Sequence, residues 1–482
     1  MGAVVRTNIP ARLDRLPWSN WHWRILIGLG TVWILDGLEV TIVGTLGDRL
    51  THPQSGLHLS PTEVGLAAAA YVIGAVLGAL VFGGLTDWLG RKRIFVVTLA
   101  LYLVATLATA LSFNAWSFFA FRFLTGSAIG GEYSAINSAI DELIPARVRG
   151  RVDLLVNGSF WLGAMAGSAA SILLLDQSLL PLNIGWRVAF SLGALLGVAI
   201  LLVRRHVPES PRWLFLHARD QEAEQIVAAV EQRVASEKGR LAPVEDYVSV
   251  QTGLRSGLRA VARTLAVKYR KRTAVGLALF VGQAFLYNAV FFTQAMVLSK
   301  FFGVRDARVG AFMIPLALGN FLGPALLGAL FDTIGRRVMI TASFVLSGLL
   351  LIGTALLFQR ELLSTSTLTI AWSAVFFFAS AAASSAYLTV SEVFPMEIRA
   401  SAIALFYAIG TGLGGVIGPV LFGAAIEVGT RSAVASGYYL GAALMILAGL
   451  AEGLLGVEAA RASLEQIAPP LSTVSEEPPG LR

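Results

Sequence analysis

Twelve apolar stretches of about 17 to 25 residues recur along the 482-residue chain, and each is long enough to cross a bilayer once as a helix. Only 14% of the residues are charged, against roughly 25% in soluble domains. A helix satisfies its own backbone hydrogen bonds, which lipid cannot do. The sequence therefore predicts an all-α integral membrane protein with spans at 24–46, 63–85, 94–111, 116–140, 153–175, 187–203, 273–298, 309–330, 338–358, 368–390, 401–422 and 437–455.

The basic residues indicate the side of the membrane on which each loop lies. Lys and Arg concentrate in the loops on the side that holds both termini, and the positive-inside rule places that side in the cytoplasm. This asymmetry explains the net charge of +7 without a nucleic-acid partner. No small-residue cleavage site follows the first apolar run, so we expect it to remain as an anchor. The use of Arg, Ala and Gly over Lys is typical of GC-rich bacteria, so we predict a multi-pass protein of the bacterial plasma membrane.

The sequence shows no motif that is typical of an enzyme. There is no cysteine, which excludes disulfides and thiolate chemistry, and the five histidines form no metal-spaced pair. No nucleotide-binding or hydrolytic motif is present either. We expect no enzymatic activity, no metal and no cofactor.

The two halves of the chain repeat the same motifs at an offset of about 250 residues. GGLTDWLGRK (83–92) returns as GALFDTIGRR (328–337), ELIPARVRG (142–150) as EVFPMEIRA (392–400), and PESPR (208–212), more weakly, as VEAAR (457–461). A duplicated set of helices with a site between the halves is the plan of secondary transporters. We predict a six-helix half at 1–203, a connector at 204–272, a second half at 273–456 and a tail at 457–482. In the connector, Ser210 as N-cap and Pro211 at the first helical position predict one amphipathic helix.

These motifs resemble those of the major facilitator superfamily over nearly the whole chain. The G-x-x-x-D-x-x-G-R-[RK] loop after spans two and eight is the most specific of them, and RFLTGSAIGGE (122–132) is similar to the R-x-x-x-G-x-x-x-G motif of span four. PESPRWL and the E-x-x-P-x-x-x-R pattern resemble the sugar and metabolite transporter branch. The resemblance implies twelve transmembrane helices in two six-helix halves around a central cavity, and alternating access as the mechanism.

The repeated loops are predicted to form a cytoplasmic gate. Asp87 is placed to pair with Arg91 at i,i+4 or to cap a facing helix, and Gly83 and Gly84 would let span two approach a neighbour closely. The alternative is that the loop arginines serve only as positive-inside anchors. The second copy of the loop argues against this alternative, because it repeats the Asp at the same spacing. The resemblance implies latches within the E-x-x-P-x-x-x-R motifs as well. The predicted gate residues are Asp87, Arg91, Glu142, Arg149, Asp332, Arg336, Glu392 and Arg399.

Two carboxylates near the middle of span one are the candidate proton carriers. Each costs about 2.5–3.5 kcal/mol to insert, and Asp36 and Glu39 lie within one sector of the helix. Counting residues from the outer ends puts Glu39 level with Arg122, the only basic residue away from the ends of a span, while Glu132 lies below the midplane. Three acids against one base leave at least one able to carry a proton. The alternative is a static Glu39–Arg122 pair with the other acids hydrogen-bonded. The resemblance to sugar–proton symporters favours coupling through Glu39, and DGLE resembles the D-G-x-D of aromatic-acid symporters.

Amides and one aromatic residue are the candidate substrate-binding groups. The resemblance aligns Gln283 and Asn288 with the Q-Q-x-x-x-x-N helix of sugar porters, Asn157 with their span-five glutamine and Tyr387 with their span-ten tryptophan. The first glutamine of that motif is Gly282 here, and no G-P-x-P flanks Tyr387. Each residue alone could equally join two helices by a hydrogen bond.

The predicted function is a proton-coupled symporter that imports a small polar metabolite, either sugar- or polyol-like or a small organic acid. A proton-driven drug or metabolite exporter is the alternative, although the span-five proline motif of exporters is absent and GGVIGPVLFG lies on span eleven instead. A non-transporting receptor on the same fold also remains open. The expected partners are a small-molecule substrate, protons and the lipid bilayer, with the chain a monomer.

Overall fold

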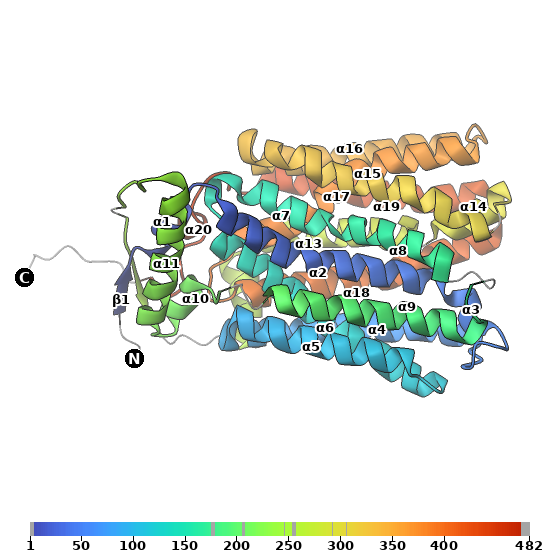
Figure 1. The fold of residues 1–482 in the computed structure, drawn as a ribbon. Helices are drawn as coiled ribbons and strands as arrows, with labels where there is room; N and C mark the ends of the chain where they lie inside the picture. Colours follow the sequence, from blue (N-terminus) through green and yellow to red (C-terminus); the bar gives the residue numbers. More distant parts are fainter. Residues whose placement is uncertain are drawn as a thin grey trace, which may run out of the picture.

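The structure is a computed structural model, and it describes residues 4–174, 179–204, 208–244, 246–252, 257–291, 293–304 and 306–473. Long helices lie side by side along one direction, and the first and last described elements, β1 (Val4–Thr7) and α20 (Leu464–Ile467), lie at one end of the bundle (Figure 1). We call this the termini end and the opposite one the far end. The first half consists of α2 (Asn20–Thr45), α4 (Pro61–Leu89), α5 (Arg91–Ala110), α6 (Ala115–Leu143), α7 (Arg149–Gly158) continued by α8 (Phe160–Leu174), and α9 (Leu182–Arg204).

The second half repeats this arrangement, and together the halves give the twelve predicted spans. It consists of α13 (Arg270–Leu286) continued by the π-helix η3 (Tyr287–Phe291) and α14 (Gln294–Phe302), then α15 (Asp306–Thr333), α16 (Arg336–Gln359), α17 (Thr365–Val393), α18 (Arg399–Val428) and α19 (Arg431–Leu455). Within the described chain, nine helices are each long and apolar enough to cross a membrane. Large aliphatic side chains such as Val104, Leu195 and Leu326 are exposed on the outer surface, as expected where lipid covers the protein.

Small residues let the helices of the first half approach closely. A Cβ added to Gly126 would lie 2.0 Å from the carbonyl oxygen of Tyr71, and one added to Gly74 would lie 2.1 Å from that of Phe123. Substitution of either glycine would push α4 and α6 apart. This contact fixes Tyr71 of α4 beside the inner face of α6. Gly83, as predicted, faces another helix, since its Cβ would lie 2.4 Å from Ala404 of α18, but Gly84 faces open space, so the prediction was wrong there.

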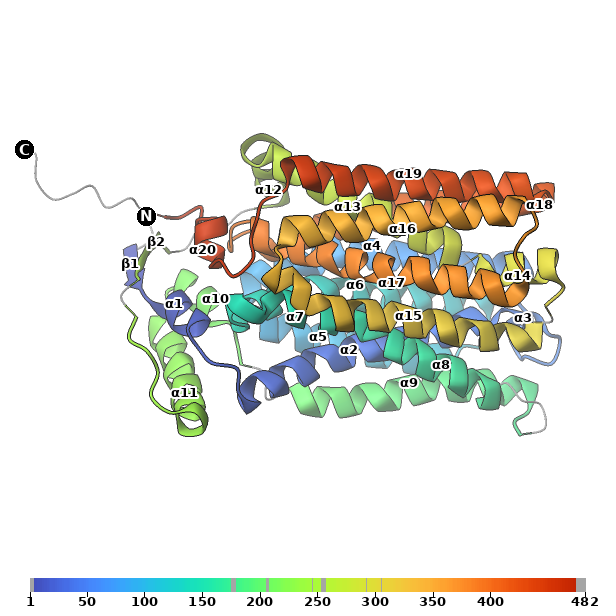
Figure 2. The same cartoon turned by 90° about the horizontal axis from the view of Figure 1, so that it is seen from above.

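A small layer of short elements covers the termini end (Figure 2). The N-terminal strand β1 (Val4–Thr7) pairs antiparallel with β2 (Val248–Gln251) of the connector, which the sequence did not predict. Arg212 connects this layer to the bundle. Its guanidinium donates a 2.6 Å hydrogen bond to the carbonyl of Glu142 and forms ion pairs with Asp14 and Glu465. The other short elements at this end are α1 (Ile9–Asp14), η1 (Ala146–Val148), α10 (Pro211–Leu216), α11 (Asp220–Lys238), α12 (Leu258–Arg263), η2 (Thr264–Lys268) and α20 (Leu464–Ile467). The short helix α3 (Gly47–Thr51) lies at the far end.

The connector helix starts where predicted but breaks early. Ser210 caps α10 by accepting from the Trp213 amide, with Pro211 at the first position. The helix then stops at Leu216, and Ala218 takes a φ of 56° before α11 begins. The single predicted helix is therefore two, because the apolar α10 packs into the bundle while the charged α11 lies on the surface.

Candidate functional site

Asp36 lies buried in the middle of α2 and is held by two tyrosines. The Tyr71 hydroxyl of α4 donates to one carboxylate oxygen at 3.3 Å, and the Tyr133 hydroxyl of α6 donates to the other. Asp36 is 2% exposed, so these phenols replace the water that an ionised carboxylate would otherwise bind. Its ionised form is thus supported by neutral donors.

Glu39, one turn further along α2, forms an ion pair with Arg122 of α6. The Nη1–Oε1 distance is 2.6 Å and both side chains are 3% exposed. The guanidinium also lies over the Tyr71 ring, 4.4 Å from its centroid. The structure therefore brings together three of the four predicted coupling residues at one level of the bundle. Tyr71 is the link between the two acids, since its hydroxyl contacts Asp36 and its ring contacts Arg122.

Glu132, the fourth predicted coupling residue, faces a different neighbour. It is buried on α6 against α5, where the Thr98 hydroxyl lies 3.5 Å from its carboxylate. The next residue, Tyr133, carries the phenol that contacts Asp36. Glu132 thus lies behind the central acids rather than between the two halves.

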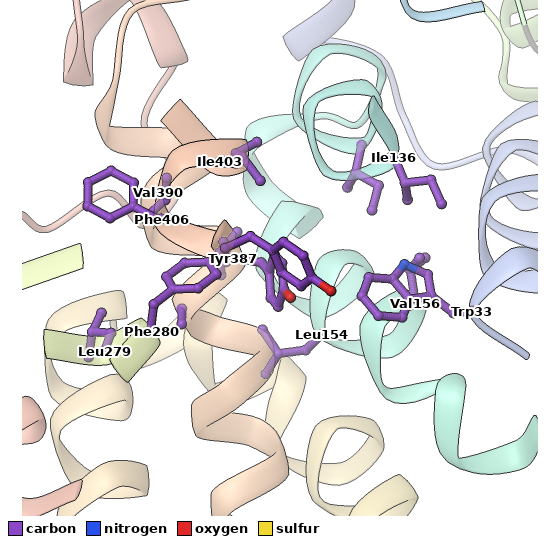
Figure 3. Close-up of a cluster of buried hydrophobic side chains, with 14 of the residues drawn as sticks. Trp33, Ile136, Leu154, Val156, Leu279, Phe280, Tyr387, Val390, Ile403 and Phe406 are labelled. Atoms are coloured by element: carbon purple, nitrogen blue, oxygen red, sulfur yellow. The ribbon is translucent and has the colours of Figure 1, made fainter. Parts of the chain in front are cut away.

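An aromatic cluster joins the halves beside Asp36. Tyr133 stacks on Trp33 of α2 at a centroid distance of 4.4 Å, and its edge meets Tyr407 of α18 at 5.0 Å. Tyr387 of α17 lies between Trp33 and Phe280 of α13, as Figure 3 shows. Tyr387 was predicted as a site residue, but the other four were not. An aromatic residue at mid-span next to a buried acid, as in GGEYS, is the signal that could have pointed to Tyr133.

The predicted amides divide between this cluster and the helices around it. Asn157 donates 2.9 Å to Asn137, which lies one turn from Tyr133 on α6. Gln283 is half-buried one turn from Phe280 on α13, and Asn288 donates 2.7 Å to the carbonyl of Ala284 in its own helix. The structure thus places Tyr387 next to Tyr133 and Asn157 next to Asn137. Asn288 lies two helical turns away from Phe280.

A second contact between the halves lies closer to the far end than the aromatic cluster beside Asp36. Trp161 of α8 stacks on Tyr287 at a centroid distance of 5.7 Å. The Tyr287 hydroxyl donates 2.7 Å to Asn320 of α15, a buried amide that the sequence analysis did not single out. These residues continue the aromatic contacts between the halves beyond the level of Asp36.

At the termini end, charged residues of each half bind the other half. Glu142 of α6 pairs with Arg91 at 2.7 Å within its own half and with Arg399 of α18 at 3.5 Å. Glu392 of α17 likewise pairs with Arg336 at 3.0 Å and with Arg149 of α7 at 3.6 Å. The acid and arginine of each E-x-x-P-x-x-x-R motif therefore contact partners in the opposite copy, not each other as the resemblance had implied. We call these four pairs, together with Asp87 and Asp332, the gate.

Asp87 and Asp332 close the gate by capping helices of the opposite half. Asp332 accepts from the backbone of Gly150 at 3.0 Å and Arg151 at 2.8 Å, where α7 begins. Asp87 accepts from the Ser401 backbone at 2.9 Å and its hydroxyl at 2.7 Å, where α18 begins. A carboxylate at a helix N-terminus satisfies free N–H groups and the helix dipole together. Both carboxylates are largely covered by protein.

The weak PESPR repeat has a structural counterpart. Gly90 and Gly335 take positive φ values of 97° and 124°, and each precedes a helix that begins with arginine. Glu209 accepts from the Arg91 amide at 2.9 Å and Glu458 from the Arg336 amide at 2.8 Å. A side chain at either glycine would collide with the capping carboxylate. Burial raises the pKa of Glu209, although these backbone donors oppose the shift.

A duplicated twelve-helix bundle with buried carboxylates at its centre and a gate between its halves is the architecture of a secondary membrane transporter, not of an enzyme. The chain matches the sugar (and other) transporter family over residues 29–470 and belongs to it. It is therefore a multi-pass membrane protein of the major facilitator superfamily.

Two transporters of named substrates align over most of the chain. The niacin transporter NiaP of Acinetobacter baylyi is 27% identical over 86% of this chain and 89% of its own, and the gallate transporter of Pseudomonas putida is 26% identical over 86% and 88%. Among solved structures, the proton:xylose symporter XylE of E. coli, bound to 6-bromo-6-deoxy-D-glucose, superposes with a TM-score of 0.76 over 93% of this chain and 98% of that chain, at 17% identity. The last comparison supports the fold.

Proposed function

We propose that this protein imports a small organic acid with a planar ring together with protons, across a bacterial inner membrane, by alternating access. In this proposal the termini end lies in the cytoplasm and a single chain forms the whole pathway. The observation that carries the proposal is the contact of Asp36 with Tyr133, because the same tyrosine packs against aromatic rings of the opposite half. A proton on Asp36 and a substrate ring between the halves would therefore act on one shared side chain.

The aromatic cluster favours a planar substrate. Trp33, Tyr133, Phe280 and Tyr387 offer ring faces and edges where the halves meet, and a substrate ring could replace one of these contacts with another of the same kind. Relatives that carry niacin and gallate fit this chemistry. An anion would be repelled by ionised Asp36 and Glu39, so a proton bound with it lowers the cost of entry.

We assign proton coupling to Asp36 and Glu39. Glu132 is the alternative proton carrier if neither of these two acids is involved. Arg122 already neutralises Glu39 through the 2.6 Å pair, whereas Asp36 is held by neutral phenols. Protonation of Asp36 would release Tyr133 from its role as a donor. Protonation of Glu39 would instead free Arg122 for a substrate carboxylate.

A sugar or polyol is the second candidate, and the amides support it. Gln283 is half-buried one turn from Phe280, and Asn157 bonds to Asn137, which lies one turn from Tyr133. From these positions amides could bind hydroxyls without a fixed charge. Amide ligands matter less to an aromatic acid than to a hydroxylated ring. Substitution of Gln283 by Ala therefore distinguishes the two substrate classes.

A binding screen on the purified protein identifies the substrate class. We would compare thermal unfolding with nicotinate, 4-hydroxybenzoate, gallate, xylose and myo-inositol, since a ligand at 100 times its Kd adds about 2.7 kcal/mol of stability. We expect aromatic acids to raise Tm and Gln283→Ala to leave that shift in place. Stabilisation by xylose or inositol alone, lost in Gln283→Ala, would reassign the substrate.

Transport assays in proteoliposomes then test the coupling. With an identified substrate, wild type should accumulate it against its gradient when a proton gradient is imposed. Asp36→Asn or Glu39→Gln should abolish accumulation but retain counterflow exchange, because the amide mimics the protonated acid. If Asp36→Asn, Glu39→Gln and Glu132→Gln all still accumulate substrate, the carboxylates do not couple protons. Proton-driven movement in the outward direction would instead identify an exporter, and binding without any flux a receptor.

A further inference from the structure

Two carboxyls beside the gate have no role in holding it closed. Asp141 lies near the end of α6 and Asp153 on α7, and both are completely buried. Within the described chain, none of their four oxygens accepts a hydrogen bond. Buried acids without partners are rare in native proteins and call for an explanation.

Two neutral donors near these carboxyls form their hydrogen bonds elsewhere. The Ser391 hydroxyl donates 2.9 Å to the carbonyl of Leu388, and the Asn157 amide donates to Asn137 and to the backbone of Asp153. Asp141 and Asp153 face each other. The other charged groups that face Asp141 are Arg149 of α7, Glu392 of α17 and Arg399 of α18, and those that face Asp153 are Glu392 and Arg336 of α16.

The gate arginines are already matched by other acids. Arg91 and Arg399 share Glu142, Arg149 and Arg336 share Glu392, and Asp87 and Asp332 add one more carboxylate to each group. The four arginines thus face four acids before Asp141 and Asp153 are counted. Two further negative charges would be uncompensated in a fully buried region, at a cost of several kcal/mol each.

The internal repeat shows that gate closure does not need this acid pair. The ion pairs of the gate and its helix-capping carboxylates occur twice, once in each half, but the positions equivalent to Asp141 and Asp153 at the offset of about 250 are Ser391 and Ile403. The second half therefore closes its side of the gate with a neutral residue at each position. This asymmetry separates the acid pair from the structural part of the gate.

We propose that Asp141 and Asp153 form a proton-binding site that titrates as the gate opens and closes. In the closed gate the two carboxyls are neutral and carry protons, because burial leaves them no compensating partner. When the halves separate at this end, water reaches both groups and they release their protons to that compartment. The inference rests on the proposed alternating access, but it concerns the gate and not the central acids.

The direction of the pH effect follows from this difference in bound protons. The closed state binds more protons than the open state, so acid favours closure and a rise in pH favours opening. With two protons released, the logarithm of the open-to-closed ratio should rise by up to two per pH unit. With one proton released, the slope should not exceed one.

Spin-label distances across the gate test this without any substrate or proton gradient. The chain has no native cysteine, so Arg93→Cys at the start of α5 and Val338→Cys at the start of α16 give one labelled site in each half. Both side chains are exposed and lie outside the gate pairs. Double electron–electron resonance in lipid nanodiscs from pH 5 to 9 then reports the open fraction.

We expect the open fraction of the labelled wild type to rise with pH, with a slope above one. Asp141→Asn combined with Asp153→Asn should remain closed across the whole range, and each single variant should lower the slope to one or less. Asp141→Ser combined with Asp153→Ile, which installs the residues of the other half, should behave as the double amide does and guards against a folding defect. Glu222→Gln, at an exposed ion pair on α11, is the matched control and should titrate as wild type.

Three outcomes would overturn the inference. The wild type could show no pH dependence of the gate distance, or the double variants could titrate as wild type does. Alternatively, Asp36→Asn could remove the pH dependence while the gate variants retain it, which would assign the proton to the central site. In that last case the proposed symport would stand and only the gate site would fall.

Discussion

Removal of the Asp332 side chain should shift the protein toward a state open at the termini end. In the closed gate this carboxylate accepts two backbone hydrogen bonds, at 3.0 and 2.8 Å, and pairs with Arg336 at 2.8 Å. In Asp332→Ala the amides of Gly150 and Arg151 lose their acceptor. Arg336 keeps Glu392, with both nitrogen–oxygen distances at 3.0 Å, so no charge is stranded.

The expected magnitude follows from the two lost backbone bonds. Hydrogen bonds to a charged group contribute about 1.5–3 kcal/mol each, and we take a total of about 3 kcal/mol because Arg336 recovers part of its interaction. Water satisfies the same amides once the gate is open, so the whole loss falls on the closed state. At about 1.4 kcal/mol per tenfold change, the closed-to-open ratio should fall about 100-fold.

The labels at Arg93→Cys and Val338→Cys measure this ratio directly. Asp87→Ala should shift it in the same direction, because Asp87 caps α18 as Asp332 caps α7. Glu222→Ala should leave it unchanged, because an exposed ion pair contributes little. A closed-to-open ratio in Asp332→Ala within threefold of wild type, in protein that unfolds at the normal temperature, would refute the view that these caps hold the gate shut.

Three further predictions concern other parts of the molecule. A cysteine at the exposed Ser236 should be labelled by an impermeant reagent only after the cells are opened, and labelling in intact cells would reverse the proposed topology. Tyr133→Phe keeps the stacking on Trp33 but loses a donor to Asp36, worth about 1.5–3 kcal/mol, so accumulation should fall about tenfold or more while counterflow persists. Glu231→Gln should speed hydrogen exchange in α1, since Glu231 holds Arg12 at 2.6 Å. Burial opposes ionisation of Glu231, but Arg12 and Arg15 lower its pKa overall, so this attachment should persist above that pKa and weaken as pH falls through it.

Local sequence properties were enough to predict the helices and several of their ends. The length of each apolar run fixes a membrane span, because the bilayer sets both the thickness and the need for internal hydrogen bonds. Ser210 and Pro211 marked the start of α10 correctly, since an N-cap depends on its nearest neighbours. The repeated loops located the gate motifs in the chain, and residue counting put Glu39 level with Arg122.

Only the tertiary structure decided which partners the E-x-x-P-x-x-x-R motifs contact. Glu142 lies seven residues before Arg149 in the same motif, yet it binds Arg399 of the other half, while Arg149 reaches Glu392. Trp33, Tyr133 and Tyr387 are far apart in sequence and meet because α2, α6 and α17 converge. The lack of hydrogen bonds to Asp141 and Asp153 could not be predicted from the sequence either, because it depends on the positions of all neighbouring groups. Hydrophobic length and capping act within a few residues of one helix, whereas these contacts arise from the packing of two six-helix halves against each other.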